Sequence, residues 1–261
     1  MEASLWVSKT GLDAQQMRMT TISNNLANVN TTGFKRDRAV FEDLLYQNIR
    51  QAGGSTGGGN ASPTGLMLGT GVRVVSTEKL HMQGSMIQTK NALDFAVQGE
   101  GMFQVLLPDG TMGYTRDGSF KLSVDRELVT ANGMVVQPSI VIPQDAESIS
   151  VGEDGTVSIQ PYGNAEEQII GQLQLARFVN YAGLEPMGQN LYRETSASGA
   201  ATIVTPTEQG AGRIAQGSLE AANVNVVEEM VNMIETQRAY EINSKAISSV
   251  DSMLRFLNQN L

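Results

Sequence analysis

The sequence predicts an α+β fold, in which long N- and C-terminal helices form a coiled-coil-like inner domain and an antiparallel β-rich outer domain is inserted between them. Two observations concern chain breakers: all seven Pro residues lie between Pro63 and Pro206, and all but two of the 27 Gly residues lie between Gly53 and Gly217. A third is the apolar pattern, which has heptad spacing at both ends and short strand-like runs in the middle.

The N-terminal segment, residues 1–33, is predicted to be helical. One position of a heptad repeat is occupied by Leu5, Leu12, Met19 and Leu26. The second position is occupied later in the segment by Ile22 and Val29. A helix with this repeat presents one apolar seam. We expect Thr32 and Gly33 to end it, because Gly is the usual residue just past a helix.

The C-terminal segment, residues 218–261, contains neither Gly nor Pro and carries a stronger repeat. Residues three and four apart form a stripe at Met233, Thr236, Tyr240, Asn243, Ile247, Val250, Leu254 and Leu257. As one helix, residues 226–257 would span roughly 48 Å. A core helix or a hairpin of the two ends within one molecule is one explanation. Burying a Leu contributes only ~1.5–3 kcal/mol, and ordering a residue costs ~1–2 kcal/mol, so helices of this length favour several neighbouring copies.

The middle of the chain, residues 71–217, is predicted to be the β-rich outer domain. Asp-Gly and Asn-Gly pairs, which are strong hairpin signals, end at Gly110, Gly118, Gly133 and Gly155. Candidate strands are residues 72–80, 102–107, 120–124, 156–159 and 169–179. Residues 34–70 are predicted to connect the first helix to this domain. They include a Gly-rich stretch at 53–60 whose composition is typical of a flexible linker.

Several classes of function are disfavoured by composition. The formal net charge of −9 argues against nucleic-acid binding, which requires clustered Lys and Arg. The chain has no Cys and a single His, His81, expected in a strand, so thiol chemistry and the common zinc sites are excluded. The acids between residues 140 and 171 form either a solvated face or a cation site. We therefore predict no enzyme activity, no cofactor and no metal, and no segment apolar enough to enter a membrane.

Two passages resemble a known family. Residues 23–35 read SNNLANVNTTGFK, and residues 223–241 read NVNVVEEMVNMIETQRAYE. Together they resemble the bacterial flagellar axial family of rod, hook and hook-junction proteins. Residues 4–16, 38–46 and 114–120 are most similar to the distal-rod branch of that family. The likeness extends over essentially the whole chain.

This resemblance implies a structural subunit that self-assembles into a helical tube, spans the periplasm and transmits torque from motor to hook. Its partners would be further copies, proximal rod proteins, the hook protein, the peptidoglycan-layer and outer-membrane ring proteins, and the flagellar export apparatus. Export would proceed without a cleaved signal peptide, since residues 1–10 lack the basic and apolar blocks of one. The expected polymerisation interface comprises Leu5, Leu12, Met19, Ile22, Asn25, Leu26, Asn28, Val29, Met233, Tyr240, Asn243, Ile247, Val250, Leu254 and Leu257.

Two alternatives stay open at this point. One is a proximal rod protein that also carries a β domain. The other, from a different class, is a secreted carbohydrate-binding β module, which would need exposed aromatic side chains on its β face. The size of the β insert favours the distal-rod branch, because it is too small for the multi-domain hook protein and too large for the minimal proximal rod subunits.

Overall fold

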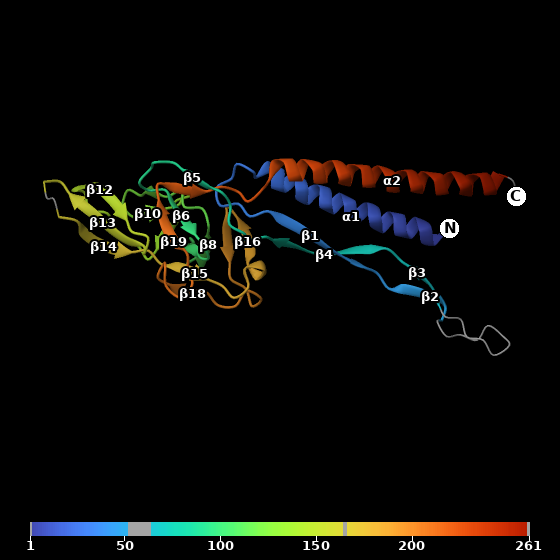
Figure 1. Cartoon of the computed structure of the whole chain (residues 1–261), viewed down its shortest axis with the longest axis horizontal. Coiled ribbons are helices and arrows are strands. Elements are labelled where there is room, and N and C mark those ends of the chain that lie inside the picture. Colours follow the sequence, from blue (N-terminus) through green and yellow to red (C-terminus); the bar gives the residue numbers. More distant parts are fainter. Residues whose placement is uncertain (1, 52–63, 164–165, 260–261) are drawn as a thin grey trace. The chain divides into compact units, whose positions relative to one another are not determined.

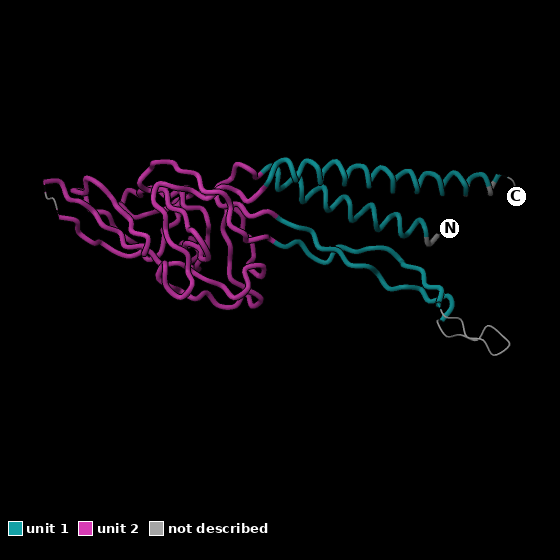
Figure 2. The backbone as a smooth tube through the Cα atoms, in the orientation of Figure 1, with its two compact units in different colours: residues 1–27, 37–78, 225–261 teal, residues 28–36, 79–224 magenta. Residues whose placement is uncertain are grey.

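The computed structural model describes residues 2–51, 64–163 and 166–259 (Figure 1). Two helices, α1 (Glu2–Ala27) and α2 (Val226–Gln259), flank a chain of strands. The chain forms two compact units (Figure 2). Unit 1 comprises residues 1–27, 37–78 and 225–261, and unit 2 comprises residues 28–36 and 79–224. This arrangement confirms the predicted fold class of packed terminal helices with an antiparallel β-rich region between them in the chain.

Unit 1 contains the helix pair and a β ribbon. α1 packs against α2 and also against β1 (Asp37–Asp43). β1 pairs with β4 (Val72–Lys79), and β2 (Tyr46–Arg50) pairs antiparallel with β3 (Leu66–Gly69). β1, β2 and β3 lie in the segment that the sequence analysis treated as a connection. The Gly-rich stretch 53–60 lies outside the described residues.

Unit 2 is built on a nine-stranded sheet in which most strands follow the order β16-β17-β8-β7-β11-β10-β9, while β15 joins β7 to β18. In chain order these strands are β7 (Met102–Leu106), β8 (Met112–Thr115), β9 (Lys121–Leu122), β10 (Leu128–Val129), β11 (Val135–Gln137), β15 (Leu175–Arg177), β16 (Glu185–Gly188), β17 (Leu191–Arg193) and β18 (Thr202–Val204). A short 3-10 helix, η1 (Tyr181–Gly183), precedes β16.

Three smaller sheets complete unit 2. An antiparallel sheet has the order β12-β13-β14 and comprises β12 (Ala146–Val151), β13 (Thr156–Pro161) and β14 (Gln168–Gln172). Two antiparallel pairs are β6–β19 and β5–β20. Their strands are β5 (Met86–Gln88), β6 (Phe95–Gln98), β19 (Arg213–Gln216) and β20 (Ser218–Glu220).

The core of unit 2 consists of large apolar side chains removed from water. Phe95, Phe103 and Phe120 form a tilted and edge-on aromatic group, in which the rings of Phe103 and Phe120 are 5.1 Å apart. Residues of the three-stranded sheet, including Val157 and Ile159, belong to the same cluster. A second cluster centres on Met102, with Tyr114, Ala176, Phe178, Leu184 and Tyr192.

Both helices are shorter than the segments predicted to be helical. α2 runs from Val226 to Gln259, and residues 218–220 of the predicted segment form β20 instead. α1 ends at Ala27, several residues before Thr32. There Asn28 starts a turn, since its carbonyl accepts a bond from Thr31 N at 3.0 Å. The apolar repeat therefore continues for one position, Val29, beyond the helix itself.

Two of the predicted strands were wrong in extent. The run 120–124 forms only the short strand β9, because Ser123 and Arg126 close a hairpin turn in which Arg126 has φ 63°. The run 169–179 is divided between β14 and β15. The chain changes sheet at that point: β14 pairs with β13, whereas β15 pairs with β7 and β18.

Candidate functional site

Most interface residues predicted on the first helix lie on the partly or fully buried side of α1. Ile22 and Asn25 are buried, while Leu5, Leu12, Met19 and Leu26 are half-buried. Asn28 and Val29 follow α1 in the turn, so they do not belong to the helical seam. If Asn28 and Val29 take part in the polymerisation interface, they do so from the turn after α1 and not from the helix.

The stripe predicted on the second helix faces α1 of the same molecule. Half-buried members of the stripe are Met233, Tyr240, Asn243, Ile247 and Val250. α1 is the element that packs against α2, and a Cβ placed on Gly11 would lie 3.2 Å from Asn243 Nδ2. Leu254 and Leu257 also lie in α2, but their side chains lie outside the described part of the structure.

Polar side chains occupy much of the seam between α1 and α2. Thr236 is buried, with Oγ1 donating to the carbonyl of Asn232 at 2.6 Å. Asn25 Nδ2 donates to the carbonyl of Asp37 at 2.9 Å, and its Oδ1 accepts from Asp37 N at 2.8 Å. Asn25 therefore joins α1 to the start of β1 within unit 1.

A second apolar face of α2 is exposed. It comprises Val226, Val227, Met230, Val231, Ile234, Ile242, Met253 and Phe256, which are 38–70% exposed. Stepping 100° per residue places Val227, Ile234 and Phe256 roughly opposite Asn243 and Ile247. α2 is therefore apolar on two sides, of which one contacts α1. The sequence analysis missed this outer face, although residues 227, 231 and 234 already show helical spacing.

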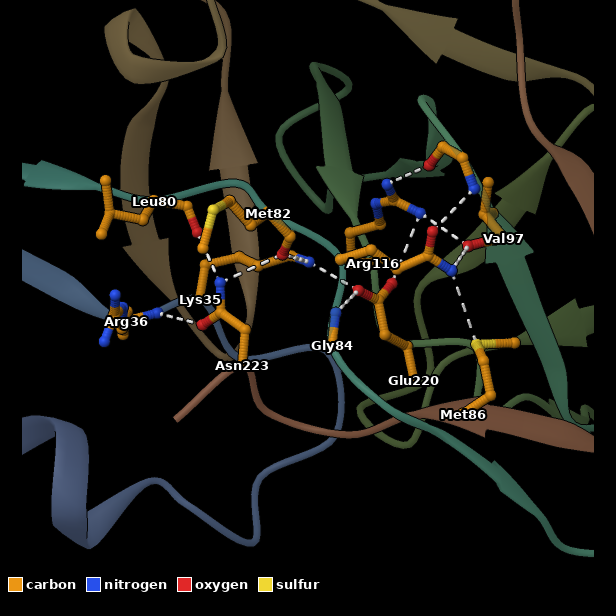
Figure 3. A network of polar contacts seen from close by, with 12 residues as sticks. Lys35, Arg36, Leu80, Met82, Gly84, Met86, Val97, Arg116, Glu220 and Asn223 are labelled. Carbon is orange, nitrogen blue, oxygen red and sulfur yellow. Dashed lines mark hydrogen bonds and ion pairs between the residues drawn. The ribbon is translucent and has the colours of Figure 1, made fainter. Parts of the chain in front are cut away.

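A buried polar cluster lies where the chain enters and leaves unit 2 (Figure 3). We define this crossover cluster as Lys35, Arg116, Glu220 and Asn223 with the backbone groups they bind. Lys35 Nζ donates to Glu220 Oε1 at 2.6 Å and to the carbonyl of Met82 at 2.7 Å. Arg116 lies 3.4 Å from Glu220 Oε2. Lys35 and Glu220 have fully buried side chains, so their charges are held away from water.

Asn223 connects three separate segments in this cluster. Its Oδ1 accepts from Arg36 N at 2.7 Å, and its Nδ2 donates to the carbonyls of Leu80 at 2.7 Å and Met82 at 3.0 Å (Figure 3). Residue 36 precedes β1, residues 80 and 82 follow β4, and residue 223 precedes α2. The side-chain amide of Asn223 thus ties its own segment to two others, and at each of the three the chain passes from one unit to the other.

Burial controls the charges of the cluster. Loss of solvation lowers the pKa of Lys35, an effect that the attraction of Glu220 opposes. Loss of solvation also lowers the pKa of the Arg116 guanidinium, again against the attraction of Glu220. In the described part of the chain, Glu220 is the carboxylate that pairs with both cations. The crossover cluster thus contains two buried cations and one buried anion.

His81 lies next to this cluster and does not belong to a strand, contrary to expectation, because β4 ends at Lys79. The centroid of its ring lies 5.6 Å from that of Tyr181 and 5.3 Å from that of Tyr192. Burial, followed by the charges of Lys35, Arg116 and Lys79, lowers the pKa of His81 to about 4. With Glu100, Met102, Arg116 and Tyr181, His81 lines a cavity of about 80 Å³.

Two exposed aspartates, Asp109 and Asp154, are held in turns. Asp109 accepts hydrogen bonds from the side chain and backbone of Thr111, which lower the pKa of Asp109. Asp154 is held in the same way by Thr156. Among the described residues, no group of three His, Asp or Glu side chains is placed to hold a metal ion. Within the same residues, neither helix is sufficiently apolar over its length to cross a membrane.

Comparison with known proteins places three parts of the chain in related families. Residues 5–35 match the family "Flagella basal body rod protein", and residues 96–159 match the "Flagellar hook protein FlgE/F/G D1 domain". Residues 215–260 match the "Flagellar basal body rod FlgEFG protein C-terminal" family. These matches include most of α1, the part of unit 2 from β6 to β13, and α2.

Full-length relatives agree with these matches. The flagellar basal-body rod protein FlgG of Buchnera aphidicola subsp. Acyrthosiphon pisum is 55% identical over 259 residues, covering 99% of this chain and 100% of the relative. The protein of the same name from Borreliella burgdorferi is 46% identical, covering 99% and 98%. That of Caulobacter vibrioides is also 46% identical, covering 98% of each chain. The chain therefore belongs to the FlgG family of flagellar basal-body rod proteins, and it is a non-enzymatic structural subunit of the distal rod.

Proposed function

We propose that this subunit polymerises through its terminal helices into a helical tube, with the outer apolar face of α2 as the main contact between copies. The observation that carries this proposal is the exposure of that face, on which Val227 is 70% and Phe256 67% exposed. Exposed apolar side chains on a helix mark an interaction site, and here they gather at Val227–Ile234 and again at Met253 and Phe256, with exposed Arg238 and Lys245 between the two groups. The opposite side of α2 already packs against α1, so a second copy has the outer face available.

The predicted interface residues have a different place in this proposal. Met233, Tyr240 and Ile247 hold α2 against α1 within one subunit, and they build the two-helix unit that repeats in the tube. Ile22 and Asn25 contribute from α1. The heptad stripe then determines the shape of the helix pair within each subunit, and the outer face of α2 determines how neighbouring subunits meet.

Assembly with other rod and hook components follows from the family. We propose that the proximal rod proteins and the hook protein contact the two ends of the tube, and that the peptidoglycan-layer and outer-membrane rings surround it. The tube would span the periplasm and transmit torque from motor to hook. The subunit would reach this place through the flagellar export apparatus, without a cleaved signal peptide.

The substitution Ile234→Asp tests the outer face. Ile234 is 49% exposed in the single subunit, so the variant subunit should remain folded with a free energy of unfolding within about 0.5 kcal/mol of the original. In a tube the new charge would be buried in every copy, and a buried unpaired charge costs several kcal/mol. Basal bodies purified from cells with only this variant should show short rods without hooks by electron microscopy.

Ser244→Asp provides the matched control, because it places the same charge at an exposed, already polar position of α2. Rods should form normally with it. Ile247→Asp, on the side facing α1, should weaken the helix pair in the isolated subunit as well, measured as lost helical circular dichroism. If Ile234→Asp assembles as well as Ser244→Asp, the outer face is not the contact between copies.

A further inference from the structure

The crossover cluster contains two cations whose charges depend on a residue from the far end of the chain. The Lys35 side chain is fully buried, and that of Arg116 is 5% exposed. Arg116 is already anchored by nearby residues, since it donates to the carbonyl of Val97 at 2.9 Å and also to that of Gly99. Neither carbonyl supplies a negative charge. The structure holds these cations in place with neutral acceptors and compensates them mainly with Glu220, while Glu100 makes a smaller favourable contribution at Arg116.

Glu220 arrives through β20, the last strand before α2. It lies 185 residues after Lys35 in the chain, and β20 pairs with β5 so that Glu220 is opposite Met86. Its Oε1 also accepts from Gly84 N at 2.8 Å (Figure 3). A Cβ placed on Gly84 would lie 2.0 Å from the carbonyl of Ala221, so the segment after β20 packs directly on this backbone. β20 therefore both delivers the charge and covers the site.

We propose that Glu220 is the closing residue of unit 2, which cannot form a stable β unit until the segment 218–224 has docked. Before docking, Lys35 and Arg116 have no carboxylate in the cluster, and burying both would leave two unpaired cations together. Removal of one partner from a buried ion pair is strongly destabilising, because the other charge is left uncompensated. Unit 2 should then favour an open state in which both cations contact water.

Every chain is made from its N-terminus, so Lys35 and Arg116 exist long before Glu220. Unit 2 is therefore expected to stay open in the growing chain until synthesis is almost complete.

The first test compares two Glu→Gln changes in the full chain. Glu220→Gln keeps the shape of the side chain and removes its charge. Glu185→Gln does the same at a 52% exposed position in unit 2, where Glu185 pairs with Arg193 at 2.7 Å. Hydrogen exchange of the β7 amides measures opening of unit 2. We expect Glu220→Gln to raise the opening equilibrium constant at least about 100-fold, and Glu185→Gln to change it less than about threefold.

A rescue separates charge from packing. Adding Lys35→Met to Glu220→Gln removes one of the two uncompensated cations, and it should recover at least about tenfold of the lost protection. If Glu220 acts only through packing or hydrogen bonds, Lys35→Met removes further contacts and makes the double variant worse. That result would overturn the proposal, and so would a Glu220→Gln effect as small as that of Glu185→Gln.

A single-molecule experiment tests the order of events. The full chain is held at its two ends and pulled with optical tweezers. Loss of the segment 218–224 should coincide with loss of the rest of unit 2 in one step. In the double variant Lys35→Met/Glu220→Gln, an intermediate lacking only this segment should persist. A persistent intermediate of that kind in the unmodified chain would refute the closing role. These measurements use isolated subunits, so they stand apart from failure or success of rod assembly.

Discussion

The two units differ in what they bury. In unit 2, Phe95, Phe103 and Val105 are completely buried, and even its charged cluster is shielded from water. In unit 1, the least exposed side chains of the helix pair are Asn25 and Thr236, which are polar, while one side of α2 exposes apolar residues. A domain with an apolar interior carries its own stability. A helix pair with a polar seam and an exposed apolar face is suited to gain stability from partners.

The largest expected effect is on the interior of unit 2. Phe103→Ala removes a fully buried ring that contacts Phe120 edge-on, so it should lower the free energy of unfolding by about 3–5 kcal/mol. Urea denaturation monitored by the near-ultraviolet signal of the tyrosines measures this loss. The control Val179→Ala, at a 94% exposed position in the same unit, should change it by less than about 0.5 kcal/mol. Equal effects would mean that unit 2 has no specific interior.

Limited proteolysis compares the units directly. Arg238 is exposed on α2 in unit 1, and Lys121 is exposed on β9 in unit 2. Cleavage requires local opening, which costs little where few apolar contacts are buried. In the isolated subunit, trypsin should therefore cut at Arg238 at least about 100 times faster than at Lys121. Mass spectrometry of timed digests gives both rates. Similar rates at the two sites would show that the helix pair is as stable as the β unit.

Acid should affect unit 2 through His81. Its pKa of about 4 in the folded protein is below the ordinary value of 6.5, so the unfolded chain binds more protons between these values. Stability is therefore complete above pH 6.5 and falls as the pH drops towards 4. The loss attributable to His81 between pH 7 and pH 4 should be about 3 kcal/mol. Denaturation at pH 7 and pH 4 measures it, and His81→Gln should remove this part of the pH dependence. An unchanged dependence in His81→Gln would exclude His81 as the cause.

The sequence was most informative where structure follows from local pattern. α2 was predicted along the whole of its apolar stripe, because a regular stripe without Gly or Pro favours a helix. Its start was placed too early, since residues 218–220 lack Gly and Pro but pair with β5 as β20. β7 was predicted with an error of one residue, since its run of apolar residues is bounded by Gly101 and Pro108. The end of α1 was misjudged because Val29 preserves the repeat although Asn28 already turns the chain.

The crossover cluster was invisible to the same reasoning. Lys35 and Glu220 resemble ordinary surface charges in the sequence, and only the pairing of β20 with β5 brings them together. Their separation of 185 residues leaves no periodic signal. The change of sheet between β14 and β15 was missed for a related reason. A continuous apolar run does not show which neighbour each half will pair with, because pairing is decided by residues far away in the chain.

Conversion of the Asn223 amide into a carboxylate would affect its hydrogen bonds unequally. Hydrolysis of a side-chain amide releases ammonia and leaves a carboxylate, with almost no change in shape. At Asn223 this reaction would replace the donor that serves the carbonyls of Leu80 and Met82 by an oxygen that repels them. The bond from Arg36 N would survive. A carboxylate at this position would therefore loosen the segment after β4 selectively and leave the bond to residue 36 in place.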